Sequence, residues 1–478
     1  MQTGLEEQLG PYQKRIPIVT RSIKGRFRNF KTAILISAYA VFFLLPWLPW
    51  SRPDAPSQAV LFDIPARRFL MFGLTAYPQD IVWFALLLFI AALLLFFVTG
   101  LVGRAFCGYF CFQTLWTDFF IWIERLLQGE RPARIRLYRQ PWGSEKILKV
   151  GGTHVLWIIV SFWTALTFVL YFAHAPEMVA RFFHGDADLA AYLTVGILTI
   201  TTYAAAGWMR EQVCTYICPY GRFQSVMYAP QTLAVHYDAR RGENVQGRAA
   251  ARAGLRTLDE RHAKGHGDCV DCGLCVQVCP AGIDIREGLQ YKCISCGLCI
   301  DACNSIMDSF QFPRGLIRYD AEVNLDQAKP APPRLHWKRL NILGYGVALL
   351  GMSGLLIYSI ATRQSFDSTI SQIRQPLYVV MSNGDIRNRY QIHLTNKMSQ
   401  PVRYRIATPN LPAGALDIGN FQELQLQAGR SALVQASVRL SAEQAARTNN
   451  VVFHITPINV PGKTQVEKVH FDKPEWIR

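Results

Sequence analysis

The sequence has no unpaired cysteine, because each of its twelve cysteines falls into a C-x2-C or C-x3-C spacing. This pattern argues against a disulfide framework and indicates metal ligation in a reducing compartment. The sequence also lacks a Walker A loop, a C-x-x-C-H haem attachment and a G-x-G-x-x-G after a strand. Without these motifs, the sequence gives no indication of a hydrolase, a nicotinamide site or an energy-driven pump. No short apolar run with a small-residue cleavage site opens the chain, so we expect no removable signal peptide.

Acidic residues are scarce: 34 Asp and Glu stand against 50 Lys and Arg in 478 residues, which gives a formal net charge of +16. A basic, aromatic-rich chain could bind nucleic acid, but long apolar runs indicate a membrane first, and we expect no nucleic-acid partner. Five runs are long enough to cross a bilayer. They cover residues 33–50, 81–101, 153–173, 188–209 and 340–361.

Basic residues are unevenly divided among the loops between these runs. Lys and Arg number seven in residues 1–32, eight in 102–152 and seventeen in 210–339, against three in 51–80 and one in 174–187. Because basic loops stay on the cytoplasmic side, the three rich segments are predicted to be cytoplasmic. An odd number of spans then places the tail on the far side of a bacterial inner membrane, in the periplasm.

The tail has no cysteine and carries the pattern of a β domain. Its short, partly alternating runs are separated by Asn, Pro, Gly and Ser, which indicates strands and turns. The runs are RYQIHLTNK, QPVRYRIATPN, FQELQLQAG, SALVQASVRL and NVVFHITPI. Runs at this spacing predict a small sandwich of immunoglobulin type, for which we expect no chemistry of its own.

Eight cysteines lie between residues 269 and 303, in two copies of C-x2-C-x2-C-x3-C. This is the ligand run of bacterial ferredoxins, in which three cysteines of a run hold one cluster and the fourth goes to the other. We expect one [4Fe–4S] cluster on Cys269, Cys272, Cys275 and Cys303, and a second on Cys293, Cys296, Cys299 and Cys279. Zinc also binds C-x2-C pairs, but two interlocking four-cysteine runs favour iron–sulfur.

The other four cysteines form an internal repeat beside two apolar runs. GRAFCGYFCFQ follows the second run, and REQVCTYICPYGRFQ follows the fourth. Each copy has an arginine, a C-x3-C pair and a glutamine: Arg104, Cys107, Cys111 and Gln113, against Arg210, Cys214, Cys218 and Gln224. Positions i and i+4 share one face of a helix, so each pair is predicted to offer two sulfurs to one site. The arginines are expected to favour thiolate over thiol.

These four sulfurs could hold copper as Cu(I), a further iron–sulfur cluster or a redox dithiol, and the spacing does not choose among them. A single pair could equally be two packing residues, although repetition in matched frames weakens that interpretation. His154 and His174 bracket the third run, where ordinary hydrogen-bonded histidines are favoured over haem ligands. Trp157 and Trp208 fall near run ends, which suits anchoring at the membrane interface.

The sequence thus predicts a multi-domain membrane protein. It should combine an α-helical transmembrane bundle of about five spans, an inserted two-cluster ferredoxin-like domain and a C-terminal immunoglobulin-like β-sandwich. The expected parts are a basic cytoplasmic N-terminus (1–32), a four-span core with both cysteine repeats (33–225), a cytoplasmic cluster segment (226–339, core 265–315), a fifth span (340–361) and a periplasmic β domain (362–478).

Together these features resemble the cytochrome c oxidase accessory proteins of the CcoG/FixG/RdxA type over nearly the whole chain. The membrane module is also similar to the cores of NosR and NapH proteins. The resemblance implies that the protein reduces Cu(II) to Cu(I) and so supports assembly of a cbb3-type oxidase. It implies as partners membrane lipid, the copper ion, a copper chaperone or copper-transporting ATPase, and oxidase subunits, with a homodimer left open.

Three hypotheses follow for the function. The first is a metal reductase that passes electrons to Cu(II) near the membrane cysteines, whose soft sulfurs suit Cu(I). The second is an electron conduit between a quinol and another redox protein. The third is a non-catalytic assembly scaffold, which is disfavoured because a scaffold needs no second pair of membrane thiols.

The alternating loop charges generate a prediction about topology. A reporter fused after Arg478 should be active only if it works in the periplasm, and one inserted at 240–260 should behave as cytoplasmic. Alkaline phosphatase and green fluorescent protein fusions at both positions measure this. The opposite result at either position would overturn the cytoplasmic placement of the clusters.

Overall fold

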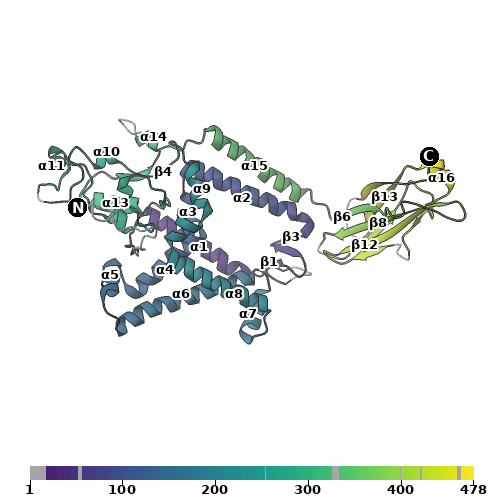
Figure 1. Cartoon of the computed structure of the whole chain (residues 1–478), viewed down its shortest axis with the longest axis horizontal. Helices are drawn as coiled ribbons and strands as arrows, with labels where there is room; N and C mark the ends of the chain where they lie inside the picture. Colours follow the sequence, from purple (N-terminus) through teal and green to yellow (C-terminus); the bar gives the residue numbers. More distant parts are fainter. Residues whose placement is uncertain are drawn as a thin grey trace. The chain divides into compact units, whose positions relative to one another are not determined.

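The computed structural model describes residues 18–51, 56–252, 254–325, 333–398, 400–419, 423–459 and 464–477. The chain forms two compact units, each built from several segments. Of the described residues, those within 18–45, 87–170 and 177–353 form the first unit, and those within 46–86, 171–176 and 354–477 form the second. Figure 1 shows a helical part with the cluster segment, and a β-rich part that ends the chain.

Five of the described helices are long and apolar enough to cross a membrane, as the sequence predicts. They cover Arg26–Trp47, Ile81–Val102, Ser144–Leu170, Leu189–Met209 and Leu340–Ala361. The first and third begin earlier than the apolar runs, at 26 rather than 33 and at 144 rather than 153. Polar side chains support the extra turns of the third helix, since Lys149 pairs with Glu145 at 2.6 Å and Lys146 Nζ donates to the Gln140 carbonyl at 2.7 Å.

The long helices of the first unit form two packed groups. Helices α2 (Ile81–Val102) and α15 (Leu340–Ala361) run side by side (Figure 1), and the rings of Phe96 and Tyr345 meet at 6.0 Å. Helices α4 (Phe112–Gln128), α6 (Ser144–Leu170) and α8 (Leu189–Thr202) form the other group with α1 (Arg26–Leu44). Phe120 and Trp157 stack at 5.4 Å in its core. Helix α8 continues as a π-helix, η4 (Tyr203–Met209).

The cluster segment is a small domain packed on the start of α1. Strands β4 (Ala234–Tyr237) and β5 (Ile317–Asp320) pair antiparallel and frame α12 (Leu274–Gln277) and α13 (Leu298–Ser309). The Asp301 carboxylate accepts hydrogen bonds from the backbone N–H of Phe27 at 3.3 Å and of Arg28 at 2.8 Å. An acidic group at a helix N-terminus is favourable, so Asp301 ties the cluster segment to the first span.

Shorter helices connect these elements. They are η2 (Leu45–Trp47), η3 (Pro78–Asp80), α3 (Ala105–Tyr109), α5 (Arg131–Arg139), α7 (Ala175–His184), η5 (Val213–Ile217), α9 (Pro219–Met227), α10 (Ala239–Gly242), α11 (Leu258–Ala263), η6 (Ile285–Glu287), α14 (Glu322–Leu325), α16 (Ala442–Arg447) and η7 (Glu475–Ile477).

The second unit contains a three-stranded antiparallel sheet that the sequence analysis did not anticipate. It consists of β1 (Val60–Asp63), β2 (Arg68–Met71) and β3 (Leu74–Ala76). Next to it, the buried Asp80 pairs with Arg363 at 2.8 Å and with Lys397 at 3.8 Å. This carboxylate therefore links the start of α2 to the segment that follows α15 and to the β domain.

The predicted immunoglobulin-like sandwich is confirmed in the tail. One sheet has the order β10-β12-β8-β6, with β7 also paired to β8, and the other has β11-β9-β13-β14. The strands are β6 (Phe366–Gln372), β7 (Val379–Val380), β8 (Ile386–Asn396), β9 (Val402–Ala407), β10 (Leu416–Asp417), β11 (Leu424–Leu426), β12 (Ser431–Leu440), β13 (Asn450–Pro457) and β14 (Gln465–His470). Strands β6 and β14, which the sequence analysis missed, lie at sheet edges and show little apolar alternation.

Asn396 generates a stability prediction for this domain. It is fully buried, its amide donates to the carbonyls of Gln400 and Leu426, and its oxygen accepts from Tyr404. Asn396→Ala should lower the free energy of unfolding by about 1–3 kcal/mol, because buried partners lose their hydrogen bonds. Amide hydrogen exchange of β8 and β9 in the full chain measures this. The exposed Asn383→Ala is the control, and equal exchange in both variants would contradict the assignment.

Candidate metal centre

The eight cysteines of the cluster segment separate into two cavities. The first is lined by Cys269, Cys272, Cys275 and Cys303. The second is lined by Cys279, Cys293, Cys296 and Cys299, with Cys275 at its edge. These are the two sets of four that the ferredoxin spacing predicts, with the fourth cysteine of each run crossing to the other cavity. The ligand assignment stays a prediction that this arrangement fits.

The two cysteine runs share one backbone conformation. In the first run Asp271 and Gly273 have φ of 47° and 64°, and in the second Ser295 and Gly297 have φ of 50° and 71°. Each run therefore turns into the left-handed region on both sides of its second cysteine, which wraps the chain around the cavity. Glycine adopts this conformation without steric cost, so Gly273 and Gly297 suit the turns that start α12 and α13.

Burial affects the protonation of these thiols. It raises the pKa of Cys275 to about 11 and that of Cys303 to about 12, with neighbouring cysteines adding to the effect at Cys303. Iron binds thiolates, so cluster binding has to release these protons. The donor set, two cavities and repeated turns fit two four-iron clusters, each of which would supply one-electron chemistry.

In both membrane repeats the first cysteine lies in a short helix and the second lies just before the next helix. Cys107 lies in α3 and Cys214 in the π-helix η5, while Cys111 and Cys218 are the residues before α4 and α9. The prediction that each pair lies on one face of a single helix is therefore wrong. The backbone is extended at the second cysteine of each pair, with ψ of 128° at Cys111 and 111° at Cys218. At Cys218 the following Pro219 disfavours a helical conformation.

The two repeats nevertheless bring their four thiols together. The other three cysteines lie near enough to Cys107 to raise its pKa. The two glutamines of the repeat cross between the copies in a reciprocal way. Gln113 Nε2 donates to the carbonyls of Ala205 at 2.7 Å and Arg210 at 3.1 Å, and Gln224 Oε1 accepts from Cys107 Sγ at 3.4 Å. The internal repeat thus forms one paired site.

The expected effect of the arginines on these thiols is only partly right. Burial and the neighbouring thiols raise the pKa of Cys107 to about 12, and Arg104 opposes this shift without outweighing it. Burial likewise raises the pKa of Cys214 to about 11. Arg210 binds Glu124 instead. The Cys107 and Cys214 thiols are therefore protonated until a metal ion displaces the proton.

The first membrane repeat touches the loop that carries the second cluster set. Tyr109 OH donates to the carbonyl of Cys296 at 2.9 Å. A Cβ added to Gly108 would lie 2.6 Å from the Ile294 carbonyl oxygen, so only glycine fits at this contact. Arg104 Nη1 donates to the Tyr291 carbonyl at 2.6 Å. Sequence reasoning missed these contacts, for which the only signal was the position of Gly108 between the paired cysteines.

A polar pocket lies where the repeats and the cluster loop meet. Its walls include Cys214, Arg104, Arg210, Lys31 and Asp118. We call it the thiol pocket. Among the described residues, no three Cys, His, Asp or Glu side chains converge as they would around a single metal ion. The four thiols lie in neighbouring segments but do not surround a common point. One copper ion could bind several of them only if their side chains moved together.

His154 and His262 have ordinary hydrogen-bonding partners. His262 Nε2 is 2.9 Å from Asp268 Oδ1, and His154 Nδ1 is 3.0 Å from the Tyr203 hydroxyl. The expectation that Trp157 anchors the third span at the membrane interface is wrong, because its side chain is buried against Phe120. Trp208 is exposed, as expected.

Family models match three parts of the chain. A 4Fe-4S dicluster domain matches residues 209–322, which include the second membrane pair and all eight ferredoxin-type cysteines. A 4Fe-4S binding domain matches residues 84–129, around Cys107 and Cys111. The Ig-like fold at the C-terminal end of FixG matches residues 356–474.

Three curated proteins are similar over most of their length. RdxA and RdxB of Cereibacter sphaeroides are 42% and 40% identical over 402 and 401 residues, which is 83% of this chain and 83% and 82% of theirs. The nitrogen fixation protein FixG of Rhizobium meliloti is 39% identical over 442 residues, 86% of this chain and 82% of its own. A crystal structure of a FixG-related protein from Vibrio parahaemolyticus matches 23% of this chain and 98% of its own, with 15% identity and a TM-score of 0.20. The chain belongs to the FixG/RdxA family and is a membrane iron–sulfur redox protein.

Proposed function

We propose that this protein reduces Cu(II) to Cu(I) at the four membrane thiols and so supplies copper for assembly of a cbb3-type cytochrome c oxidase. The observation that carries the proposal is the hydrogen bonding between the two cysteine repeats, which places both pairs next to each other beside the loop of the second cluster set. Cu(I) prefers soft thiolate ligands, so the site suits the product of the reaction.

The residues of the chain have separable tasks in this proposal. The eight ferredoxin-type cysteines would hold two clusters that store single electrons. Tyr109 and Gly108 fix the first thiol pair against the cluster loop. The positive charge of Arg104 partly offsets the rise that burial causes in the pKa of Cys107 and Cys214, which favours thiolate once copper approaches. The hydrogen bonds that Gln113 and Gln224 each make to the other repeat hold the two cysteine pairs next to each other.

The proposed location follows from the loop charges. The chain lies in a bacterial inner membrane, with its N-terminus and clusters in the cytoplasm and the β domain in the periplasm. Membrane lipid and copper ion are its immediate partners. A copper chaperone or copper-transporting ATPase would receive or deliver the ion, and cbb3 oxidase subunits are the final recipients. A homodimer remains an open form of the assembly.

A double variant tests the thiol site. Cys214→Ser with Cys218→Ser should lower anaerobic Cu(I) formation at least about tenfold, since even outer-shell partners of metal ligands are worth that much. Iron content should not change, because the eight ferredoxin-type cysteines are untouched. The clusters are first reduced with dithionite and the excess is removed, because dithionite itself reduces Cu(II). A Cu(I)-specific chelator then measures the Cu(I) formed per intact cluster after Cu(II) is added.

Tyr216→Ser is the matched control, because Tyr216 lies between the two cysteines on the same π-helical turn and is exposed. It should keep the wild-type rate. Cys107→Ser with Cys111→Ser should behave like the first double variant, because the repeats form one site. An unchanged rate in both cysteine variants would refute the thiol site.

The cluster assignment makes a prediction about iron. Anaerobically purified protein should hold about eight iron atoms, at four per cluster. Cys272→Ser should remove about four of them, because a four-iron cluster is held by four cysteines. Cys272 is exposed, so the substitution should leave the core of the segment intact. Iron and sulfide analysis with visible absorbance measures this. Stoichiometric zinc without iron would rule out the clusters, and iron well above eight would indicate a further cluster at the membrane thiols.

A further inference from the structure

A second cavity, distinct from the thiol pocket, lies among the helices of the first unit. Its volume is about 350 Å³, within the range of small-molecule sites, which are mostly apolar with a few placed polar groups. Its walls come from α4, α5, α6 and η4, and they include Glu124, Arg134, His154 and Trp208. Two of these elements, α6 and η4, belong to helices long enough to span a membrane. The cavity therefore lies beside two segments that the sequence predicts to be in the membrane.

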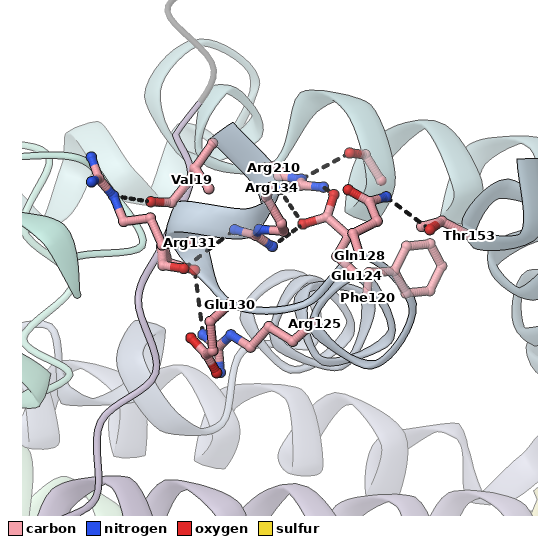
Figure 2. Close-up of polar contacts among 12 residues, drawn as sticks. Val19, Phe120, Glu124, Arg125, Gln128, Glu130, Arg131, Arg134, Thr153 and Arg210 are labelled. Atoms are coloured by element: carbon pink, nitrogen blue, oxygen red, sulfur yellow. Dashed lines mark hydrogen bonds and ion pairs between the residues drawn. The ribbon is translucent and has the colours of Figure 1, made fainter. Parts of the chain in front are cut away.

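The polar side of the cavity centres on a buried carboxylate. Glu124 accepts from Arg134 Nη1 at 2.8 Å and also binds Arg210 (Figure 2). Both Glu124 and Arg134 are almost fully buried. The carboxylate neutralises one of the two arginines, which leaves a cavity of low net charge instead of a strong anion site.

Two lining residues have hydrogen-bonding atoms to spare. Thr153 Oγ1 donates to the Lys149 carbonyl at 2.7 Å, so it must accept from Gln128 Nε2 at 2.8 Å, which fixes the orientation of the Gln128 amide (Figure 2). Within the described part of the chain, Gln128 Oε1 and Arg134 Nε are buried without a hydrogen-bond partner. One is an acceptor and the other a donor. A matching ligand therefore needs a hydroxyl that donates as well as an oxygen that accepts.

The other side of the cavity is aromatic. The His154 ring lies 5.1 Å from Trp157 and 6.0 Å from Trp208, measured between ring centroids. Its Nδ1 is paired with the Tyr203 hydroxyl. When Nδ1–H donates to that hydroxyl, Nε2 is an acceptor for a ligand proton. Flat aromatic walls favour a planar ring, and the Gln128 and Glu124 oxygens disfavour a phosphate headgroup.

The cavity also adjoins the redox site. Arg210 lines both this cavity and the thiol pocket. It has a left-handed backbone with φ of 46° and ends a π-helix, and both features recur at functional sites. A ligand here would thus be separated from the thiol pocket by one side chain.

We propose that this cavity binds a membrane hydroquinone and that His154 accepts its protons as it is oxidised. This rests on the proposed function, for which it names the class of electron donor. The two O–H bonds break in succession and two C=O bonds form. Each proton goes to His154 and on to water, and each of the two electrons goes to one of the two iron–sulfur clusters. The quinone then returns to the lipid phase.

The test uses the full chain with its clusters in detergent, under anaerobic conditions. Binding is measured by quenching of tryptophan fluorescence with an oxidised short-chain quinone, a readout that does not depend on turnover. Electron entry is measured as bleaching of visible absorbance after mixing with the corresponding hydroquinone. Benzoquinone and naphthoquinone forms run in parallel identify which lipid quinone fits.

Gln128→Leu should weaken quinone binding about tenfold, the value of one lost hydrogen bond. His154→Gln should still bind quinone but slow bleaching by about 100-fold or more, as expected for loss of a proton acceptor. His174→Leu is the matched control, since this histidine lies in the loop between α6 and α7 and outside the cavity walls. It should match the wild type in both measurements.

Three results would overturn the inference. The first is wild-type binding and bleaching in both Gln128→Leu and His154→Gln. The second is displacement of quinone by anionic phospholipid, which would mark a headgroup site. The third is failure of hydroquinone to bleach wild-type protein that reduces Cu(II) with dithionite, a result that leaves the proposed copper function standing. Loss of the dithionite reaction alone would count against the copper proposal instead.

Discussion

One buried cation, the guanidinium of Arg104, holds together the three parts of the chain that carry cysteine. It donates to the Tyr291 carbonyl of the cluster segment and the Gly221 carbonyl after the second thiol pair. It also lies 4.8 Å above the centre of the Tyr291 ring. A buried charge is stable only when hydrogen bonds replace its hydration, so these partners must stay in place. The meeting of both thiol pairs with the cluster loop depends on this arrangement.

The second copy of the repeat uses its arginine differently. Arg210 binds Glu124, and its guanidinium lies 5.5 Å from the centre of the Trp157 ring. The left-handed backbone appears at Gly103 in the first copy and at Arg210 itself in the second. Such a conformation costs about 1–3 kcal/mol in a residue other than glycine, which the buried ion pair helps to offset. A duplicated element has thus become asymmetric, with one arginine at the cluster loop and the other between two cavities.

The sequence predicted those features that depend on the spacing of nearby residues. Cysteine spacing predicted the two sets of four around the cavities, and apolar runs predicted the five long helices. The helical placement of the thiol pairs failed because the chain becomes extended at Cys111 and Cys218, where a new helix begins. The second cavity was invisible because Glu124, Gln128 and His154 come from two helices, and each alone resembles an ordinary polar residue. Edge strands β6 and β14 were missed because their sequences, FDSTISQ and QVEKVH, carry only two apolar residues each.

The charges around the thiol pocket bear directly on the oxidation state of a metal held there. Asp118 lies 2.9 Å from Arg28 Nη1 and 3.8 Å from Lys31 Nζ, and Glu124 binds Arg210. Arg104, whose guanidinium bonds are to carbonyls, and Lys292 in the same walls add positive charge near Cys214, against one negative charge from Glu211. Repulsion between a surplus of positive charge and a metal ion grows with the charge of the ion, and it is strong where water is excluded. In the proposed copper site these surroundings would favour Cu(I) over Cu(II), so the arginine that assembles the site would also favour reduction of the proposed substrate.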